Sequence, residues 1–220
     1  MDTIPQPIPL APHPGRFAEA SLIGRDHPDR RMVEAFIARI YAERFGADVR
    51  TFMPHLLAYR DTHGELVAAV GMRRASEGAL FVEHYLDAPV ETVLAGRVPA
   101  PPPGRPQIAE VGHFAASTPG VARELIVQLA WVLGAAQVDW VLFVATQQLR
   151  NAFARLHLSP IELAVARAER MGRGAADWGR YYQSQPRVMC GDIREGNAFL
   201  RGLACPVALP ASACGAGDAR

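Results

Sequence analysis

The loop over residues 117–122 carries residue types that bind anions, namely Ser117, Thr118, Pro119, Gly120, Val121 and Ala122. Thr118 is a good N-cap, and Pro119 suits the first helical position because its missing N–H would be unpaired there anyway. Gly120 has no β-carbon, so a ligand can come close to the backbone. Free N–H groups and the helix dipole make such a helix start a site for phosphate groups. The alternative is an ordinary capped helix that binds nothing.

Acid–base chemistry is open to four side chains near the central strand, which are Glu83, His84, Glu110 and His113. A carboxylate or an imidazole there can remove a proton from a substrate, directly or through water. Because side chains alternate along a strand, Glu110 and His113 face opposite sides unless a bulge intervenes. Two alternatives remain: Glu110 forms a buried ion pair with Arg73, and His113 has no catalytic role.

Several other chemistries lack their residues. The seven histidines and three cysteines show no H-x-x-H, H-E-x-x-H or C-x-x-C spacing, so we expect no metal site. The serines lack the G-x-S-x-G context of a hydrolase. All 23 basic residues are arginines, which excludes a lysine Schiff base and a phosphate-loop lysine.

These candidates need a scaffold, and the unit strand–loop–helix–strand over residues 108–146 supplies its centre. Apolar side chains at helical spacing predict a helix over residues 29–45. The turn at residues 61–64 predicts a hairpin, and residues 80–86 a further strand or strand end. A short helix over residues 147–158 and a last strand before residue 193 complete the order. This order predicts a mixed α/β sheet, mostly antiparallel and twisted, with helices on both faces.

We expect one domain over residues 21–201, which is a normal size. Residues 1–20 are rich in proline and predict a flexible arm, whereas residues 202–220 lack any pattern and predict a disordered tail.

The composition of the chain limits the kinds of partner that the protein is expected to bind. The net charge of +1 favours neither nucleic acid nor an anionic membrane surface. The sequence offers no signal peptide and nothing near the roughly 18 consecutive apolar residues of a membrane span, so we expect no stable membrane insertion. An odd number of cysteines fits a reducing compartment. We therefore expect a cytoplasmic protein.

The element order and the helix-start loop resemble those of the GNAT acyltransferases. In that family a Q/R-x-x-G-x-G/A loop cradles the pyrophosphate of coenzyme A, and Gly120 and Ala122 match its second half, with Ser117 in place of Gln or Arg. Members of that family often carry a tyrosine later in the chain that acts as a general acid, and this sequence lacks it. Tyr181 or Tyr182 could take its place, and the alternative is that both only pack in the core. The resemblance implies a carrier site at Ser117, Thr118, Gly120, Val121, Ala122 and Asn151.

A closer resemblance is to the thermostable hemolysin family, over roughly residues 20–200. It rests on the segments FMPHLLAYRD, AAVGMRRA, LFVEHYLDAPVE, AEVGHFA, LRNAFARLHL and WGRYYQSQP. That family is distantly similar to the acyl-homoserine-lactone synthases, whose G-x-x-R-L-L-P and E-L-S-R-F motifs resemble the sequence around Arg73 and Glu110. His113 stands where the synthases have Arg, and only Asp48 matches their acidic pair. The resemblance implies that Arg73 and Glu110 pair on neighbouring strands and line an acceptor pocket.

The resemblances predict an acyltransferase that moves an acyl group from a coenzyme A or acyl-carrier-protein thioester to a small amine. Its predicted residues are Glu110, His113, Glu83 and Tyr181 for catalysis, and Arg73 for the acceptor. Two alternatives stay open, which are a membrane-lytic protein and a catalytically inactive GNAT-like binding module. A pore needs apolar spans or an amphipathic barrel, so the enzyme is the favoured hypothesis.

Overall fold

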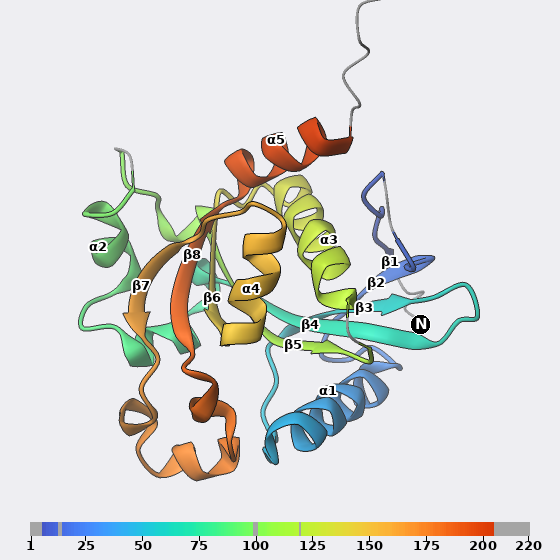
Figure 1. The fold of residues 1–220 in the computed structure, drawn as a ribbon, viewed down its shortest axis with the longest axis horizontal. Helices are drawn as coiled ribbons and strands as arrows, with labels where there is room; N and C mark the ends of the chain where they lie inside the picture. Colours follow the sequence, from blue (N-terminus) through green and yellow to red (C-terminus); the bar gives the residue numbers. More distant parts are fainter. Residues whose placement is uncertain (1–5, 13–14, 99–100, 119, 205–220) are drawn as a thin grey trace, which may run out of the picture.

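Eight strands form one mixed sheet in the computed structural model, which describes residues 6–12, 15–98, 101–118 and 120–204. The strands are β1 (Gln6–Pro7), β2 (Glu19–Ile23), β3 (His55–Arg60), β4 (Leu66–Arg74), β5 (Ile108–Ala116), β6 (Trp140–Ala145), β7 (Ile161–Val165) and β8 (Arg187–Asp192). Their order across the sheet is β1-β2-β3-β4-β5-β6-β8-β7 (Figure 1). Neighbours run antiparallel except β5 and β6, which are parallel.

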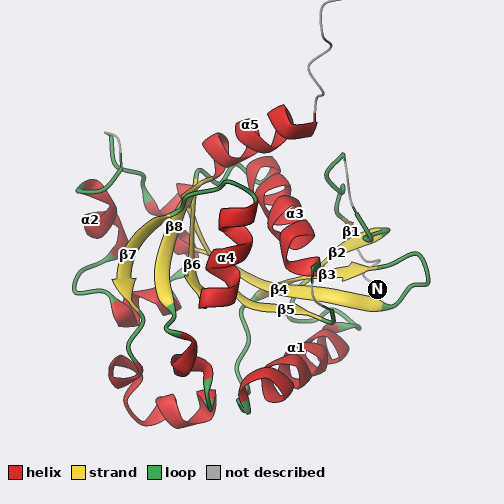
Figure 2. Cartoon of the chain, viewed as in Figure 1, coloured by secondary structure: helices red, strands yellow, loops and turns green. Residues whose placement is uncertain are grey.

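Helices cover both faces of this sheet (Figure 2). Helix α1 (Arg30–Phe45) packs on one face, and α3 (Val121–Ala135), α4 (Gln147–Arg155) and α5 (Ile193–Ala204) lie on the other. Strand β3 shows the division, because Leu56 joins the cluster of α1 while Leu57 joins the cluster of α3. The remaining helices are α2 (Val90–Ala95), η1 (Ala75–Glu77), η2 (Phe81–Tyr85), η3 (Arg105–Gln107), η4 (Ala168–Trp178) and η5 (Tyr181–Ser184). The predicted α/β fold, mostly antiparallel with helices on both faces, is confirmed.

Strand β5 has two irregularities that open the middle of the sheet. It pairs with β6 only from Ile108 to Val111, and beyond Val111 it pairs only with β4. Two residues of β5, His113 and Phe114, lie opposite the single Val70 of β4, which is a β-bulge. His113 has a φ of +51°, a conformation that few residues with a side chain adopt. The bulge and the parting strands meet at the same point of the sheet.

The amino-terminal segment differs from the expected flexible arm over residues 1–20. Gln6–Pro7 pairs with β2, and Phe17 is buried in the core. The backbone N–H of Ala11 donates to Gln128 Oε1 at 2.9 Å, which ties the segment to α3. The described part of the segment therefore belongs to the domain. At the other end α5 extends to Ala204, so the predicted tail over residues 202–220 begins too early, and its remainder lies outside the described residues.

The segment over residues 80–86 contains the 3-10 helix η2 (Phe81–Tyr85) instead of the expected strand or strand end. Acidic side chains explain this, because they bind backbone N–H groups that a strand would give to its neighbour. Glu83 accepts from the N–H of Leu80 at 2.7 Å, and Glu110 accepts from the N–H groups of Phe81 and Val82.

Candidate functional site

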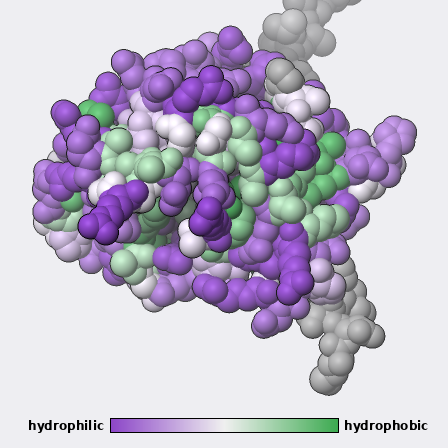
Figure 3. Space-filling model, turned by 90° about the horizontal axis from the view of Figure 1, so that it is seen from below, coloured by the Kyte–Doolittle hydropathy of each residue, from purple (hydrophilic) through white to green (hydrophobic). Residues whose placement is uncertain are grey.

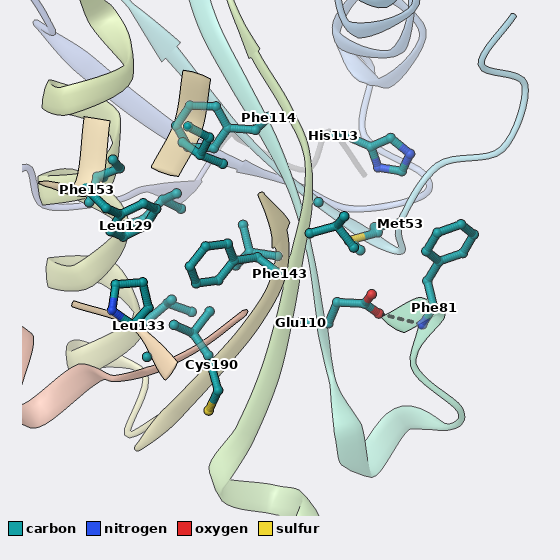
Figure 4. Close-up of a pocket in the computed structure, with 18 of the residues that line it drawn as sticks. Met53, Phe81, Glu110, His113, Phe114, Leu129, Leu133, Phe143, Phe153 and Cys190 are labelled. Atoms are coloured by element: carbon teal, nitrogen blue, oxygen red, sulfur yellow. Dashed lines mark hydrogen bonds between the residues drawn. The ribbon is translucent and has the colours of Figure 1, made fainter. Parts of the chain in front are cut away.

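A cavity of about 680 Å³ lies against β5 and receives side chains from both faces of the sheet. The side toward α3, which we call the apolar half, contains Ile126, Leu129, Leu133, Phe143, Phe153 and Phe199. The side toward α1 and η2, which we call the polar half, contains Met53, Arg73, Phe81, Glu110, His113 and Trp178. Figure 4 shows the labelled members of the two halves on either side of β5. The halves are continuous because β5 and β6 part beyond Val111.

Glu110 is the most buried acid of the cavity, with 2% of its surface exposed. Its Oε2 accepts the N–H of Phe81 at 2.7 Å, and its Oε1 accepts the N–H of Val82 at 2.8 Å (Figure 4). Burial raises the pKa of Glu110 to about 7, although the two N–H groups act to lower it. A carboxyl that gains and loses its proton near neutral pH suits acid–base chemistry.

His113 lies on the same side of β5 as Glu110, because the bulge breaks the alternation of side chains. Gly71 leaves it room, since a β-carbon there would lie 2.8 Å from His113 Nδ1. That nitrogen is buried and has no hydrogen-bond partner among the described residues. Burial lowers the pKa of His113 to about 4, so the ring is neutral at physiological pH.

Arg73 and Glu110 are register partners on β4 and β5, as the sequence predicts. The predicted ion pair between them is wrong, however, because the Glu110 carboxylate binds the N–H groups of η2 instead. Arg73 Nη1 donates to the carbonyl of Ala79 at 2.9 Å, and the side chain lines the polar half.

Glu83 and Tyr181 have different positions relative to the cavity. Glu83 does not line it and is paired with Arg105, at 3.0 Å between Oε1 and Nη1, so its predicted catalytic role has no support in the geometry. Tyr181 does line the polar half, where its ring packs against Tyr41 and Trp178. Burial raises the pKa of Tyr181 well above its usual value, so its phenol keeps its proton.

The loop before α3 differs from its predicted capping. Helix α3 begins at Val121 with Gly120 as N-cap, at a φ of +94°, and Pro119 lies outside the described residues. Thr118 does not cap the helix, because the N-cap position lies two residues later, and its Oγ1 accepts from Arg16 Nη1 at 3.0 Å. None of the predicted carrier-binding residues that the structure describes lines the cavity: Ser117, Thr118, Gly120, Val121, Ala122 and Asn151. The later turns of the same helix do line it, through Ile126 and Leu129.

The sequence profile of the thermostable hemolysin family matches residues 23–197. This chain belongs to the thermostable hemolysin family. The family resemblance inferred from the motifs is therefore confirmed. No curated protein matches the chain.

Three solved structures share the fold of this thermostable hemolysin family member at low sequence identity. TofI, in a ternary complex with an inhibitor and MTA, has a TM-score of 0.54 at 15% identity and covers 83% of this chain and 96% of its own. FeeM, an N-acyl amino acid synthase from uncultured soil microbes, has a TM-score of 0.56 at 14% identity, with coverages of 92% and 100%. BjaI, a CoA-dependent acyl-homoserine lactone synthase solved with SAM and isopentyl-CoA, has a TM-score of 0.55 at 14% identity, with coverages of 84% and 89%. These likenesses show the fold.

Two further features of this family member bear on function. Within the described ranges, no helix is long and apolar enough to cross a membrane, and no three His, Cys, Asp or Glu side chains gather as a metal site. In Figure 3 the molecule is seen from the end of α1 and η4, and hydrophobic residues gather there between hydrophilic margins. Both elements contribute to the polar half, through Tyr41 and Trp178.

Sequence reasoning missed most of the walls of the cavity. The apolar residues of α3 at positions 126, 129 and 133 have ordinary helical spacing, which is also the spacing of core residues. Phe52 and Met53 begin the family segment FMPHLLAYRD, but no residue type in this loop indicated a cavity. Asp48, which the resemblance to the lactone synthases points to, lines the polar half. It forms an ion pair with Arg50, at 2.8 Å between Oδ2 and Nε.

Proposed function

We propose that this protein is an acyltransferase that moves an acyl group from a thioester of coenzyme A or acyl carrier protein to a small amine. The observation that carries the proposal is one cavity with an apolar half on one face of the sheet and Glu110 on the other. The apolar half suits an acyl chain, because the lining side chains from α3, β6 and α4 are all apolar. The fold supports the proposal, since BjaI is a CoA-dependent acyl-homoserine lactone synthase and FeeM an N-acyl amino acid synthase.

The transfer needs a neutral amine and a stabilised oxyanion. The amine nitrogen attacks the thioester carbonyl carbon, so that a C–N bond forms, the C–S bond breaks and the sulfur leaves as a thiol. Glu110 takes the proton that the nitrogen loses and returns it to the departing sulfur. Beyond Val111, the edge of β5 that faces β6 has no strand partner in the described sheet, and we propose that a backbone N–H group along this edge stabilises the oxyanion.

The carrier is proposed to dock its phosphates beside Gly120, at the start of the helix whose later turns line the cavity. Arg16 lies at this loop, where its Nη1 donates to Thr118 Oγ1 and its Nε pairs with Glu124 of α3 at 3.2 Å. Arg16→Gln is expected to weaken the binding of coenzyme A or acyl carrier protein about tenfold, because a charge-assisted hydrogen bond is lost. Titration calorimetry compares this variant with Arg39→Gln on exposed α1, and equal affinities would remove the loop from the proposal. A side chain at Gly120 is a poorer probe, because its φ of +94° strains any substitution.

Turnover tests the activity itself. Purified protein is incubated with acyl thioesters of several chain lengths and a set of primary amines, while thiol release and amide mass are followed together. The proposal predicts one thiol for each amide, with a strong loss in Glu110→Gln. Thioester hydrolysis without amide, or no reaction with any pair, would contradict it.

A lytic activity is the second candidate, because the family description itself contains the word hemolysin. An acylated amine is amphipathic, so lysis through the product is compatible with the proposed enzyme. We place the enzyme in the cytoplasm, where acyl thioesters are available and where the buried thiol of Cys190 stays reduced.

A further inference from the structure

Arg73 is a cation of the polar half whose charge has no acidic partner among the described residues. Its one described hydrogen bond is the donation from Nη1 to the carbonyl of Ala79. A guanidinium has five N–H donors in a planar fork that matches a carboxylate. Arg50, the other cation that lines this half, is already paired with Asp48. Arg73 is therefore the cation that remains available to an incoming anion.

The position of Arg73 fixes where such an anion would lie relative to the reacting amine. Arg73 and Glu110 are opposite each other in the β4–β5 ladder, and both line the polar half. Opposite residues of antiparallel strands have β-carbons roughly 4.5–5.5 Å apart, so both side chains reach one small molecule. A ligand that satisfies both carries a carboxylate and an amine close together. An α-amino acid carries both groups on one carbon atom.

The surroundings of this pair select the rest of the ligand. Phe81 and Trp178 pack with ring centroids 5.8 Å apart, and Phe52 lies 5.4 Å from His113 by the same measure. All four side chains line the polar half, and His113 is neutral at physiological pH. An apolar or aromatic side chain gains from these walls, whereas a charged side chain loses its hydration there.

We infer that the acceptor is an α-amino acid with an apolar or aromatic side chain, whose carboxylate binds Arg73 and whose amine faces Glu110. The inference rests on the proposed acyl transfer. The products are then an N-acyl amino acid and a free thiol: the C–N bond forms, the C–S bond breaks, and the amine proton reaches the sulfur. An amino acid that arrives as an ammonium ion first releases one further proton to the solvent.

Acceptors that differ only in the carboxylate test this assignment. Leucine and phenylalanine are compared with leucinamide, phenylalaninamide and 2-phenylethylamine at a saturating acyl thioester concentration. The free acids are expected to have kcat/KM values about 10- to 100-fold higher, because the others lack the charge-assisted hydrogen bonds to the guanidinium. Arg73→Gln is expected to remove this advantage, and Arg73→Lys to restore part of it.

The comparison separates binding from a disturbed fold. Because Arg73 also holds the carbonyl of Ala79, a structural disturbance in Arg73→Gln would slow all acceptors equally. The assignment predicts that only the free acids are slowed, and Arg39→Gln on the exposed surface of α1 is expected to match the unchanged protein. Equal loss for acids and amides, or equal kcat/KM for both in the unchanged protein, would overturn the amino-acid assignment while leaving acyl transfer intact.

Binding without a donor gives a second readout that does not depend on turnover. Calorimetry with phenylalanine and phenylalaninamide is expected to show binding of the acid alone, lost in Arg73→Gln. If the acid binds but no amide is formed with any thioester, the proposed acyl transfer fails and the amino-acid site stands. If acid and amide bind equally, the site assignment fails.

Discussion

At the scale of a single residue, two opposing influences set the pKa of Glu110. Burial favours its neutral form, while the N–H groups of Phe81 and Val82 favour the carboxylate, and the pKa lies at about 7. A general base with that pKa is half ionised at neutral pH, which is where proton transfer is most effective.

The pH dependence of acyl transfer is the first prediction. In the unchanged protein kcat/KM, calculated per concentration of the neutral amine, is expected to rise with pH and to level off above about 7, as Glu110 becomes ionised. Glu110→Gln is expected to lose about 100-fold or more and to lack this limb, because glutamine cannot accept the proton. Initial rates from pH 5.5 to 8.5 measure it, with Glu43→Gln on the surface of α1 as a control. A limb near pH 7 that persists in Glu110→Gln would assign the proton transfer to another group.

The pH dependence of stability is a separate prediction from the same residue. The pKa of Glu110 is higher in the folded state, so between its ordinary value of 4.5 and about 7 the folded protein binds more protons than the unfolded chain. The stabilisation by protonated Glu110 is present below pH 4.5 and is lost as the pH rises through about 7, by up to about 3 kcal/mol.

Urea unfolding of the unchanged protein and Glu110→Gln measures this effect as a difference between the two. The difference removes the opposite contribution of His113, whose pKa of about 4 makes the folded state lose stability at acid pH in both proteins. The unchanged protein should lose stability relative to the variant between pH 5 and pH 8. A difference that stays constant over this range would contradict the buried, titrating carboxyl.

The sequence predicted the neighbours of Glu110 but not its bonds. The pairing of Arg73 with Glu110 across two strands could be inferred from the motifs, and it is confirmed. The ion pair could not be excluded from the sequence, because residues 80–86 resemble a strand. Only the structure shows that the consecutive N–H groups of Phe81 and Val82 donate hydrogen bonds to the Glu110 carboxylate.

At the scale of elements, the separation of β5 from β6 connects the two faces of the sheet. Helix α3 forms one wall of the apolar half, and Ala130 lies on that wall. Because the side chain of Ala130 is small and faces the cavity, a larger side chain at this position would fill part of the space for an acyl chain instead of displacing its neighbours.

Ala130→Phe is therefore expected to select against long acyl chains. Turnover with long-chain thioesters should fall about tenfold or more, while the shortest thioesters should react nearly as before. Overpacking costs typically about 1–3 kcal/mol of stability, so the melting temperature is recorded in parallel. Ala135→Phe, on the exposed side of the same helix, is the control. An equal loss for every chain length would show that the apolar half is not the acyl site.

The elements themselves were predicted better than their irregularities. The unit over residues 108–146 follows from strand and helix periodicity, and it is present as β5, α3 and β6. The sequence could not decide whether β5 has a bulge at His113. A strand with the bulge and a strand without it differ by only one residue of register. The sequence predicts Thr118 as the N-cap, but the helix begins only at Val121, after Gly120 with its φ of +94°, and the hydroxyl of Thr118 binds Arg16, which is distant in the sequence.

At the scale of the whole molecule, the acyltransferase that we propose has to be reconciled with a family named for hemolysis. No helix of the described chain is long and apolar enough to cross a membrane. The proposed product, an acylated amine, is amphipathic and can itself disturb a bilayer.

Dye release from vesicles separates the two sources of lysis. Protein freed of metabolites is expected to release no dye by itself at low dose, and to cause release after incubation with acyl thioester and amine. Glu110→Gln should abolish the second release. Prompt release by the protein alone, equal in Glu110→Gln, would favour direct lysis.

The cavity is the feature of the whole molecule that the sequence concealed. Its walls come from segments as far apart as Phe52 and Phe199, and each of these segments alone reads as core or loop. The family motifs pointed to Arg73 and Glu110, because these lie on the best-marked strands. The apolar half could not be predicted, although Phe153 belongs to the family segment LRNAFARLHL, since almost any set of apolar residues can line such a cavity.

A structure determined with a non-reactive acyl thioester analogue tests the central claim most directly. We predict that the acyl chain lies between β5 and β6 against Leu129, Leu133 and Phe143, with its carbonyl carbon beside β5 on the way to Glu110. A chain bound outside this cavity, or an analogue that does not bind at all, would contradict the account.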